Sequence, residues 1–331
     1  MALRETITIR PYRAGDETAI LTAVNRARAA SGEPERTLET WRWLFGDHPL
    51  GPRVVLGFDE GGEVLAQCAG IPLRARVDGR AVVFCLVLDG LNVRSERTGH
   101  TRRGLFTACS DAFREAYGGE GPGRHVFTFG FLGHTRAGRL PLGLAFLRES
   151  FVHVLPIAAA RGGDWRAELR EIDRFGPEAS ELYERVATET RADVVRDAAY
   201  LSWRYAEEPG RPARAALASV GGRPAGLAVW RTGSFEGRSA GVCLEWIVPR
   251  EESAAASALH GWMAERSRDA GHEVLVAEHS PFAREWIEFQ ERGYHLSRRP
   301  RAFFGASHMR AHPNRFFARH VRTALADVET P

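Results

Sequence analysis

One segment constrains the fold more than any other, because in it a strand leads through a loop rich in arginine and glycine into a helix. Residues 81–93 are mostly apolar and predict a buried strand, and residues 104–117 have helical spacing. A helix N-terminus presents free backbone N–H groups, and glycine lets a ligand come close to them. The loop therefore predicts a phosphate or pyrophosphate site, with a solvated turn as the alternative, and its charged and flexible residues are Arg94, Arg97, Gly99, Arg102, Arg103 and Gly104.

All 45 basic residues are arginines, because the sequence contains no lysine. This excludes Schiff-base and pyridoxal-phosphate lysines, Walker-type loops, kinases and Ser-x-x-Lys hydrolases, each of which needs a lysine amine. A GC-rich genome explains the composition itself, and arginine still binds phosphate well. The net charge of +3 does not demand a nucleic acid or an anionic membrane as partner, so we expect neither.

The four cysteines are scattered and fit neither a disulfide framework nor a zinc site. The N-terminal residues lack the apolar stretch of a signal peptide, and no segment approaches the length of a membrane span. We therefore expect a cytoplasmic protein that does not enter a membrane. Its oligomeric state cannot be read from the sequence.

A length of 331 residues suggests about two domains. In the first, residues 6–10, 54–58, 64–77, 81–93, 125–131 and 146–158 predict strands, with helices after Asp16 and around residues 41–45 and 104–117. The same order of elements recurs after residue 212, although no repeat is visible residue by residue. We predict an N-terminal domain at 1–158, a helical connector at 159–211, a second domain at 212–305 and a helical tail at 306–331, with a helix near 316–325.

These features resemble the GNAT superfamily of acyl-CoA-dependent N-acyltransferases. The resemblance depends on three segments: Leu91-Asn92-Val93 followed by residues 97–106, the opening ITIRPYRAGD, and FTFGFLGH followed by LPLGLAFL. Together they cover most of residues 5–150. The connector DAAYLSWRY and the second half are similar to tandem members of the superfamily. The resemblance implies an α/β (α+β) protein with two GNAT-like domains in tandem, each a mixed central sheet flanked by helices. Because VPREESAAASALHGWM has no glycine loop, only the first half is expected to bind CoA.

The resemblance also implies a reaction, in which acetyl-CoA or another acyl-CoA is the cosubstrate and an amine of a small-molecule acceptor attacks directly. No metal is expected. The strand backbone at 91–93 would hold the pantetheine and polarise the acyl carbonyl, and the loop amides would hold the pyrophosphate. The residues expected to bind the cosubstrate are Leu91, Asn92, Val93, Arg97, Thr98, Gly99, Arg102, Arg103, Gly104, Leu105 and Phe106.

An attacking ammonium must lose a proton, so a general base is needed. Asp89 is the first candidate for this catalytic role and His134 is the second. Each has a plainer interpretation: a strand aspartate beside Gly90 also marks a β-bulge, and a loop histidine is often only solvated.

Two other functions stay open. A non-catalytic acyl-CoA or metabolite-binding protein fits the altered loop and Gly133, which stands where the superfamily often has asparagine. A Fem-type aminoacyl transferase also fuses two GNAT-like halves, but it usually carries a long helical arm. Among other residues, Trp203 and Tyr205 suggest either core packing or a cleft wall, and the three tail histidines do not form a convincing metal site because Pro313 interrupts their spacing.

Overall fold

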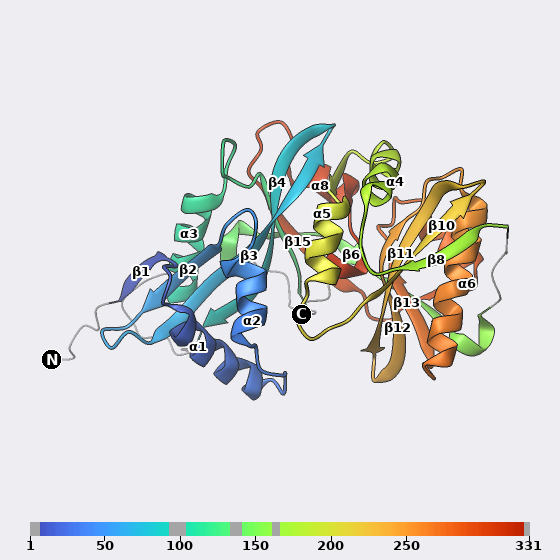
Figure 1. Cartoon of the computed structure of the whole chain (residues 1–331). Coiled ribbons are helices and arrows are strands. Elements are labelled where there is room, and N and C mark those ends of the chain that lie inside the picture. Colours follow the sequence, from blue (N-terminus) through green and yellow to red (C-terminus); the bar gives the residue numbers. More distant parts are fainter. Residues whose placement is uncertain (1–6, 93–103, 133–140, 161–165, 328–331) are drawn as a thin grey trace. The chain divides into compact units, whose positions relative to one another are not determined.

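The computed structural model describes residues 7–92, 104–132, 141–160 and 166–327 of the chain (Figure 1). These residues form two compact units. The N-terminal unit comprises residues 1–74, 82–147 and 303–317, and the C-terminal unit comprises residues 75–81, 148–302 and 318–331. Each unit therefore draws on more than one stretch of sequence. The domain boundaries drawn from the sequence stay a prediction.

The first sheet follows the order β1-β2-β3-β4-β5-β15-β6. Its antiparallel part, β1 to β4, leads into the parallel pair of β4 and β5, whose register runs from Phe84↔Phe127 to Leu86↔Phe129. The strands are β1 (Thr8–Pro11), β2 (Arg53–Phe58), β3 (Val64–Val77), β4 (Arg80–Asn92), β5 (Phe127–Leu132), β6 (Ala145–Ser150) and β15 (Arg301–Ser307). The helices are α1 (Glu17–Ala30), α2 (Leu38–Trp41), a π-turn at Arg42–Gly46 and α3 (Leu105–Tyr117).

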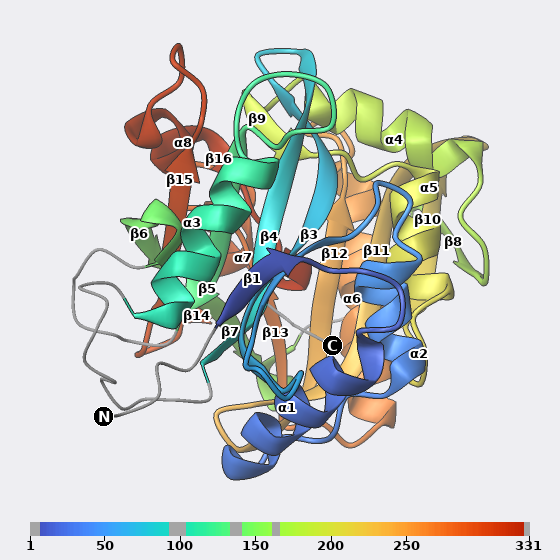
Figure 2. The same ribbon diagram turned by 90° about the vertical axis from the view of Figure 1, so that its left-hand side faces the viewer.

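The helices of the N-terminal unit cover both faces of its sheet. Figure 2 shows α3 on one side of strands β1 to β4 and α2 on the other. The packing of α3 is close, because a Cβ added to Gly57 of β2 would lie 3.1 Å from both Leu105 and Cys109 of α3. The result is the layered α/β arrangement that the sequence predicts.

The second sheet follows the order β14-β7-β13-β12-β11-β10-β8. As in the first sheet, an antiparallel meander, β10 to β12, leads into a parallel pair, here β12 with β13 from Ala240↔Val274 to Val242↔Val276. The strands are β7 (Val152–Pro156), β8 (Glu168–Ile172), β10 (Arg214–Val220), β11 (Arg223–Phe235), β12 (Arg238–Ile247), β13 (Val274–Glu278) and β14 (His295–Leu296). The helices are α4 (Pro177–Ala187), α5 (Ala198–Leu201), a π-turn at Ser202–Ala206, α6 (Ser253–Asp269) and α7 (Glu285–Glu291).

Alternation along the second sheet divides its side chains between two buried faces. Ala216, Ala228 and Leu275 pack with α6 in one apolar cluster, and Figure 1 shows α6 lying along these strands. Their neighbours in sequence, such as Leu217 and Val276, are buried too, so they point to the opposite face. Both faces of this sheet are therefore covered by other parts of the chain. This agrees with the predicted mixed sheet flanked by helices.

The two sheets exchange strands, which the sequence analysis does not predict. Residues 146–158, expected to form one strand, form β6 of the first sheet and β7 of the second. Conversely, β15 comes from late in the chain and lies between β5 and β6. Strand pairing of this kind is non-local, so an apolar run shows that a strand forms but not which sheet receives it.

Two further segments differ from their predicted secondary structure. Residues 159–211, expected to be helical, contain β8 and β9 (Ala192–Val194) besides α4 and α5. The tail helix is α8 (Asn314–His320), and the chain then forms β16 (Val321–Arg322), which pairs with β9, and a 3₁₀ turn at Leu325–Asp327.

A residue-level repeat is present after all, around the short helices α2 and α5. Thr37 accepts a hydrogen bond from the Thr40 N–H, and Asp197 accepts one from the Tyr200 N–H, so each side chain caps its helix. Each helix then widens into a π-turn, Arg42–Gly46 or Ser202–Ala206. The matching residues are Arg36 and Arg196, Trp43 and Trp203, Phe45 and Tyr205, Pro49 and Pro209, and Pro52 and Pro212. The duplication inferred from element order therefore extends to single residues.

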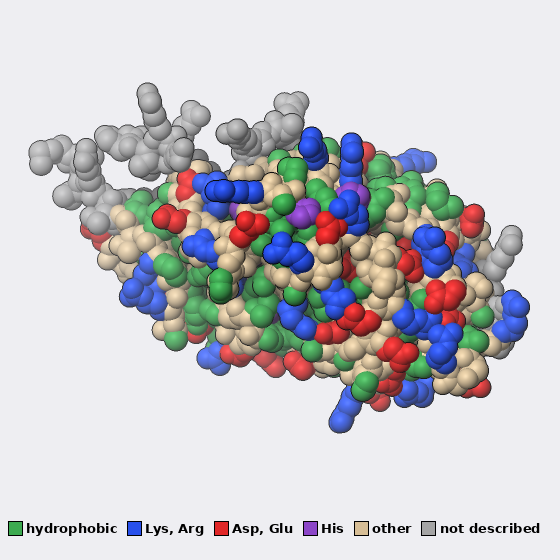
Figure 3. Space-filling view, turned by 90° about the horizontal axis from the view of Figure 1, so that it is seen from above, with side chains coloured by type: hydrophobic (Ala, Val, Ile, Leu, Met, Phe, Trp, Pro, Cys, Tyr) green, Lys and Arg blue, Asp and Glu red, His purple; other side chains and the backbone are tan. Residues whose placement is uncertain are grey.

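The surface mixes charges of both signs. On the face shown in Figure 3, arginine side chains are intermingled with aspartate and glutamate side chains. Within the described part of the chain, no helix is long and apolar enough to span a bilayer.

Candidate active site

The described residues include part of the predicted site. Asp89, Leu91 and Asn92 lie at the end of β4, and Gly104, Leu105 and Phe106 lie at the start of α3. The remaining predicted residues fall outside the described ranges, namely Val93, Arg97, Thr98, Gly99, Arg102, Arg103 and His134.

The structure brings the end of β4 and the start of α3 together. A Cβ added to Gly90 would lie 3.2 Å from the ring of Phe106, so the first turn of α3 packs directly on β4. Gly104 is the N-cap residue of α3 and is exposed, and apart from its chain neighbours no group in the described part of the chain lies within 4 Å of an added Cβ. The first N–H groups of a helix lack intrahelical acceptors, so this end of α3 offers donors to an anion.

Asp89 is held in an ion pair. Its carboxylate oxygens lie 2.8 and 2.9 Å from Nη2 of Arg36, and Nη1 of Arg28 lies 3.9 Å away. Its backbone has φ of 51°, and the Gln67 side chain donates to its carbonyl at 2.9 Å. A left-handed residue inside a strand marks a local irregularity, which is in keeping with the bulge considered for this position. The candidate base is therefore engaged by Arg36 in this structure.

The sequence analysis misses Arg36, although a signal exists. Asn25 of α1 clamps the backbone of Arg36, accepting from its N–H at 2.8 Å and donating to its carbonyl at 3.1 Å. The guanidinium is almost fully buried, with 1% of the side chain exposed. The signal is the arginine that precedes each capping residue of the repeat, Arg36 before Thr37 and Arg196 before Asp197.

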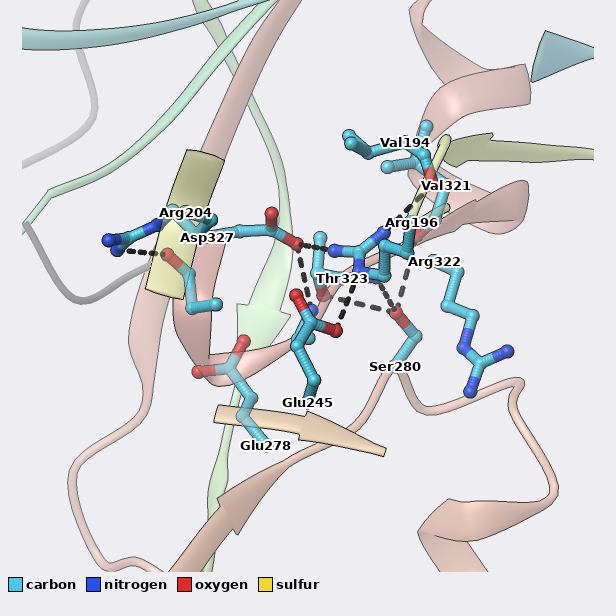
Figure 4. A network of polar contacts seen from close by, with 12 residues as sticks. Val194, Arg196, Arg204, Glu245, Glu278, Ser280, Val321, Arg322, Thr323 and Asp327 are labelled. Carbon is cyan, nitrogen blue, oxygen red and sulfur yellow. Dashed lines mark hydrogen bonds and ion pairs between the residues drawn. The ribbon is translucent and has the colours of Figure 1, made fainter. Parts of the chain in front are cut away.

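The second half contains the counterpart of this ion pair, with more charge (Figure 4). Glu245 is the third residue after the last parallel pair of β12, as Asp89 is on β4. Arg196 donates to Glu245 at 2.8 Å and to Asp327 at 2.6 Å, and Tyr205 donates to Glu245 at 2.9 Å. All four side chains are buried. Three buried ionic groups thus stand where the first half has two.

The C-terminal segment occupies the corresponding end of the second sheet. Ala324 forms a bridge with His279 beyond the end of β13, and Arg322 donates to the carbonyl of Trp246 on β12 at 3.1 Å. Ser280 and Thr323 exchange side-chain and backbone hydrogen bonds, including Thr323 N to Ser280 Oγ at 2.9 Å. The enclosed space that remains has a volume of about 20 Å³, which is room for about one water. Here the chain itself fills the end of the sheet.

The helix that follows β12 also differs from α3 at its first residue. Its N-cap is Glu252, a buried carboxylate that pairs with Arg185 and, at 2.6 Å, with Arg223. A negative charge at this helix start competes with an anionic ligand. The two helix starts therefore differ, with an exposed glycine at α3 and a carboxylate paired with two arginines at α6.

Both halves contain buried titratable groups. Burial raises the pKa of Glu278, next to the small cavity, to about 7, and raises that of Asp193 to about 6. Burial also raises the pKa of Cys85 and of Cys109 to about 12, so neither is a thiolate nucleophile at neutral pH.

Trp203 and Tyr205 are both buried, as core packing requires. Within the described ranges, no three histidine, cysteine or acidic side chains form a group that could hold a metal ion.

Comparison by sequence finds no relative, since neither a family model nor a curated protein sequence matches the chain. Comparison by structure finds proteins with a similar fold. A probable N-acyltransferase of unknown function from Enterococcus faecalis V583 superposes with a TM-score of 0.63 at 10% identity, over 95% of this chain and 74% of that one. A GCN5-related N-acetyltransferase from Anabaena variabilis ATCC 29413 gives 0.65 at 11% identity, over 92% and 73%.

Saccharomyces cerevisiae N-myristoyltransferase with bound myristoyl-CoA is also similar, with a TM-score of 0.60 and 11% identity over 92% of this chain and 83% of that one. All these similarities extend across both halves of the chain. The α/β fold with two GNAT-like halves in tandem, expected from the sequence, is confirmed, and the chain has the fold of the GNAT-like N-acyltransferases.

Proposed function

We propose that this protein is an acyl-CoA-dependent N-acyltransferase whose first half binds the thioester. The amine of a small-molecule acceptor attacks the acyl carbonyl, and acetyl is the proposed acyl group. The single observation that carries the proposal is the start of α3, where exposed Gly104 opens a helix packed directly on the end of β4. The bound myristoyl-CoA of one structural neighbour supports a CoA thioester as ligand.

Each predicted binding residue has a defined task in this proposal. The backbone at Leu91, Asn92 and Val93 holds the pantetheine and polarises the acyl carbonyl. The loop residues Arg97, Thr98, Gly99, Arg102 and Arg103, with the amides of Gly104, Leu105 and Phe106, hold the pyrophosphate. Backbone donors and arginine forks both suit phosphate oxygens, so this end of the helix favours the anionic ligand.

The reaction needs two proton transfers. The ammonium of the acceptor loses a proton before attack, and the sulfur of CoA gains one as the carbon–sulfur bond breaks. Asp89 and His134 stay the proposed bases. Since Arg36 faces both oxygens of Asp89, a second role is available to this residue, in which it fixes the end of β4 and does not touch the proton.

The first experiment is calorimetric titration of the purified full chain with CoA and with acetyl-CoA. Micromolar binding at one site per chain supports a single working half. Thiol release in the presence of candidate amines then separates an enzyme from a binding protein. Binding without thiol release favours the non-catalytic alternative, and binding of tRNA without CoA favours an aminoacyl transferase.

Substitution of the two base candidates tests the proton path. For Asp89→Asn we expect a large fall in turnover with CoA affinity retained, and the pH profile of kcat should change. Wild-type turnover in Asp89→Asn would remove this residue from the mechanism and leave His134→Ala as the informative variant. Matched Arg36→Gln distinguishes the structural role, because loss of CoA binding in both variants would mean that the ion pair only shapes the site.

A further inference from the structure

The C-terminal unit contains a hollow that the proposed acyl transfer does not use. Its volume is about 250 Å³, whereas one buried water needs only about 10–15 Å³. It is lined by the segment between α4 and β9, the loop before α6, the segment from Phe282 to the start of α7, and the chain from α8 to β16. The hollow therefore has room for a small organic molecule.

Arginine dominates the lining. Five arginines line the hollow, together with His320, and the lining contains two glutamates. The arginines are Arg191, Arg250, Arg284, Arg319 and Arg322, and the carboxylates are Glu189 and Glu285. Two further carboxylates pair with these arginines from outside the lining, Asp78 with Arg191 at 2.8 Å and Glu288 with Arg284 at 2.8 Å. Five arginines thus face four carboxylates, and one positive charge remains in excess.

The two glutamates are already shared between arginines. Glu189 lies 3.2 Å from Arg284 and 4.0 Å from Arg250. Glu285 lies 3.0 Å from Arg322 and 3.6 Å from Arg284. Arg284 and Arg322 also donate to the backbone carbonyls of Val248 and Trp246. These contacts fix the walls of the hollow and hold two of its guanidinium groups in place.

Arg250 and Arg319 have donors to spare. The Arg250 side chain is 73% exposed, and its nearest carboxylate is Glu189 at 4.0 Å. Arg319 is exposed at the end of α8, and within the part of the chain that the structure describes it has no recorded acidic partner. Each guanidinium carries five N–H donors in a planar fork, which matches phosphate oxygens in pairs.

The side chain of His320 lies in the field of these arginines. The pKa of His320 is lowered, first by burial and then by the charge of Arg191, while Asp78 acts to raise it and Arg319 to lower it further. An anion bound between these arginines would offset that repulsion, since opposite charges attract strongly where water is partly excluded.

We propose that this hollow is a binding site for a small phosphorylated molecule, with the phosphate or diphosphate held by Arg250, Arg319 and Arg322. Diphosphate is favoured over a single carboxylate because it offers several oxygens to the spare donors of Arg250 and Arg319 and to Arg322, which line the same hollow. This inference goes beyond acyl transfer and does not depend on it.

The test is calorimetric titration of the full chain with inorganic pyrophosphate at low ionic strength. All proteins in the test carry Gly104→Glu, so that the start of α3 cannot bind the probe. We expect one site per chain, at least tenfold weaker affinity after Arg250→Glu and Arg319→Glu together, and no change after Arg170→Glu. Arg170 is a matched control because it lies in the same unit, its side chain is 66% exposed, and it does not line the hollow.

Two results would overturn the proposal: equal pyrophosphate affinity with and without Arg250 and Arg319, or an equal loss in the Arg170→Glu control, which would mean that only net charge matters. Circular dichroism checks the fold of every variant. If the double variant does not fold, Arg319→Gln alone provides the test, because its side chain is exposed, and there we expect at least a threefold loss.

Discussion

The two halves share a backbone plan but fill corresponding positions with different chemistry. After the matched capping residues, the first half continues with buried Leu44 and His48, whereas the second half has buried Arg204 and Glu208, which form an ion pair at 3.2 Å. Asp89, near the end of β4, has one close arginine. Glu245, near the end of β12, belongs to a network that includes the C-terminal segment. The same fold can thus carry a single ion pair at this position in one half and a larger, internally paired network in the other.

The largest effect on stability is expected from substitution of the matched arginines, Arg36 and Arg196. Arg196→Met would leave Glu245 and Asp327 buried without their shared partner, and we expect a loss of about 3–5 kcal/mol in the free energy of unfolding. Arg36→Met should cost about 1–3 kcal/mol, since Arg28 at 3.9 Å can partly replace it. Urea unfolding followed by tryptophan fluorescence measures both. Equal losses would mean that the second network adds no stability of its own.

This difference between the halves also shows what the sequence can and cannot predict. The strand that ends near Asn92 and the helix from Gly104 follow from local apolar spacing, and so does the order of elements in both halves. The pairing of Arg36 with Asp89 joins residues far apart along the chain, so no local pattern contains it. The repeat of Arg36 and Arg196 before capping residues was readable, but only as a sparse match of single residues.

The buried carboxyl of Glu278 should make the stability of the second half depend on pH. The pKa of this buried carboxyl is about 7 in the folded chain against an ordinary 4.5, so folding favours its protonated form. Its ionisation therefore lowers stability as pH rises from about 4.5 to 7, by on the order of 2–3 kcal/mol. Glu278→Gln should raise the thermal midpoint at pH 8 and leave it nearly unchanged at pH 4.5.

The first half provides the control, because Phe131 stands at the corresponding position of β5 and cannot titrate. Substitution of Phe131 by leucine should alter stability equally at both pH values. A pH-independent effect of Glu278→Gln would show that burial does not shift this carboxyl.

The start of α3 allows the first half to be made like the second. Gly104→Glu places a carboxylate where Glu252 stands at α6, and we expect CoA affinity to fall by about thirtyfold, or roughly 2 kcal/mol. Ser253→Glu, at the exposed first residue of α6, is the matched control and should leave CoA affinity unchanged. Calorimetry measures both. Unaltered CoA affinity in Gly104→Glu would place the site elsewhere.

The smallest effect concerns the matched helix caps. Thr37→Ala and Asp197→Ala each remove one side-chain acceptor for a helix N–H, at an expected cost of about 1 kcal/mol in unfolding free energy. The midpoints of thermal unfolding of the two variants should therefore be similar. A much larger loss for Asp197→Ala would show that this cap also supports the buried charges next to it.

The exchanged strands have a consequence for how the protein is made. The first sheet includes β15, which is translated only after nearly all of the second sheet. A ribosome therefore releases the N-terminal region with a gap in its sheet, between β5 and β6, that only the end of the chain can fill. Since domains usually fold from the N-terminus as they emerge, this chain departs from that order. We therefore expect the first sheet to be completed only after β15 has been made, and an excised N-terminal region that lacks β15 to fold poorly.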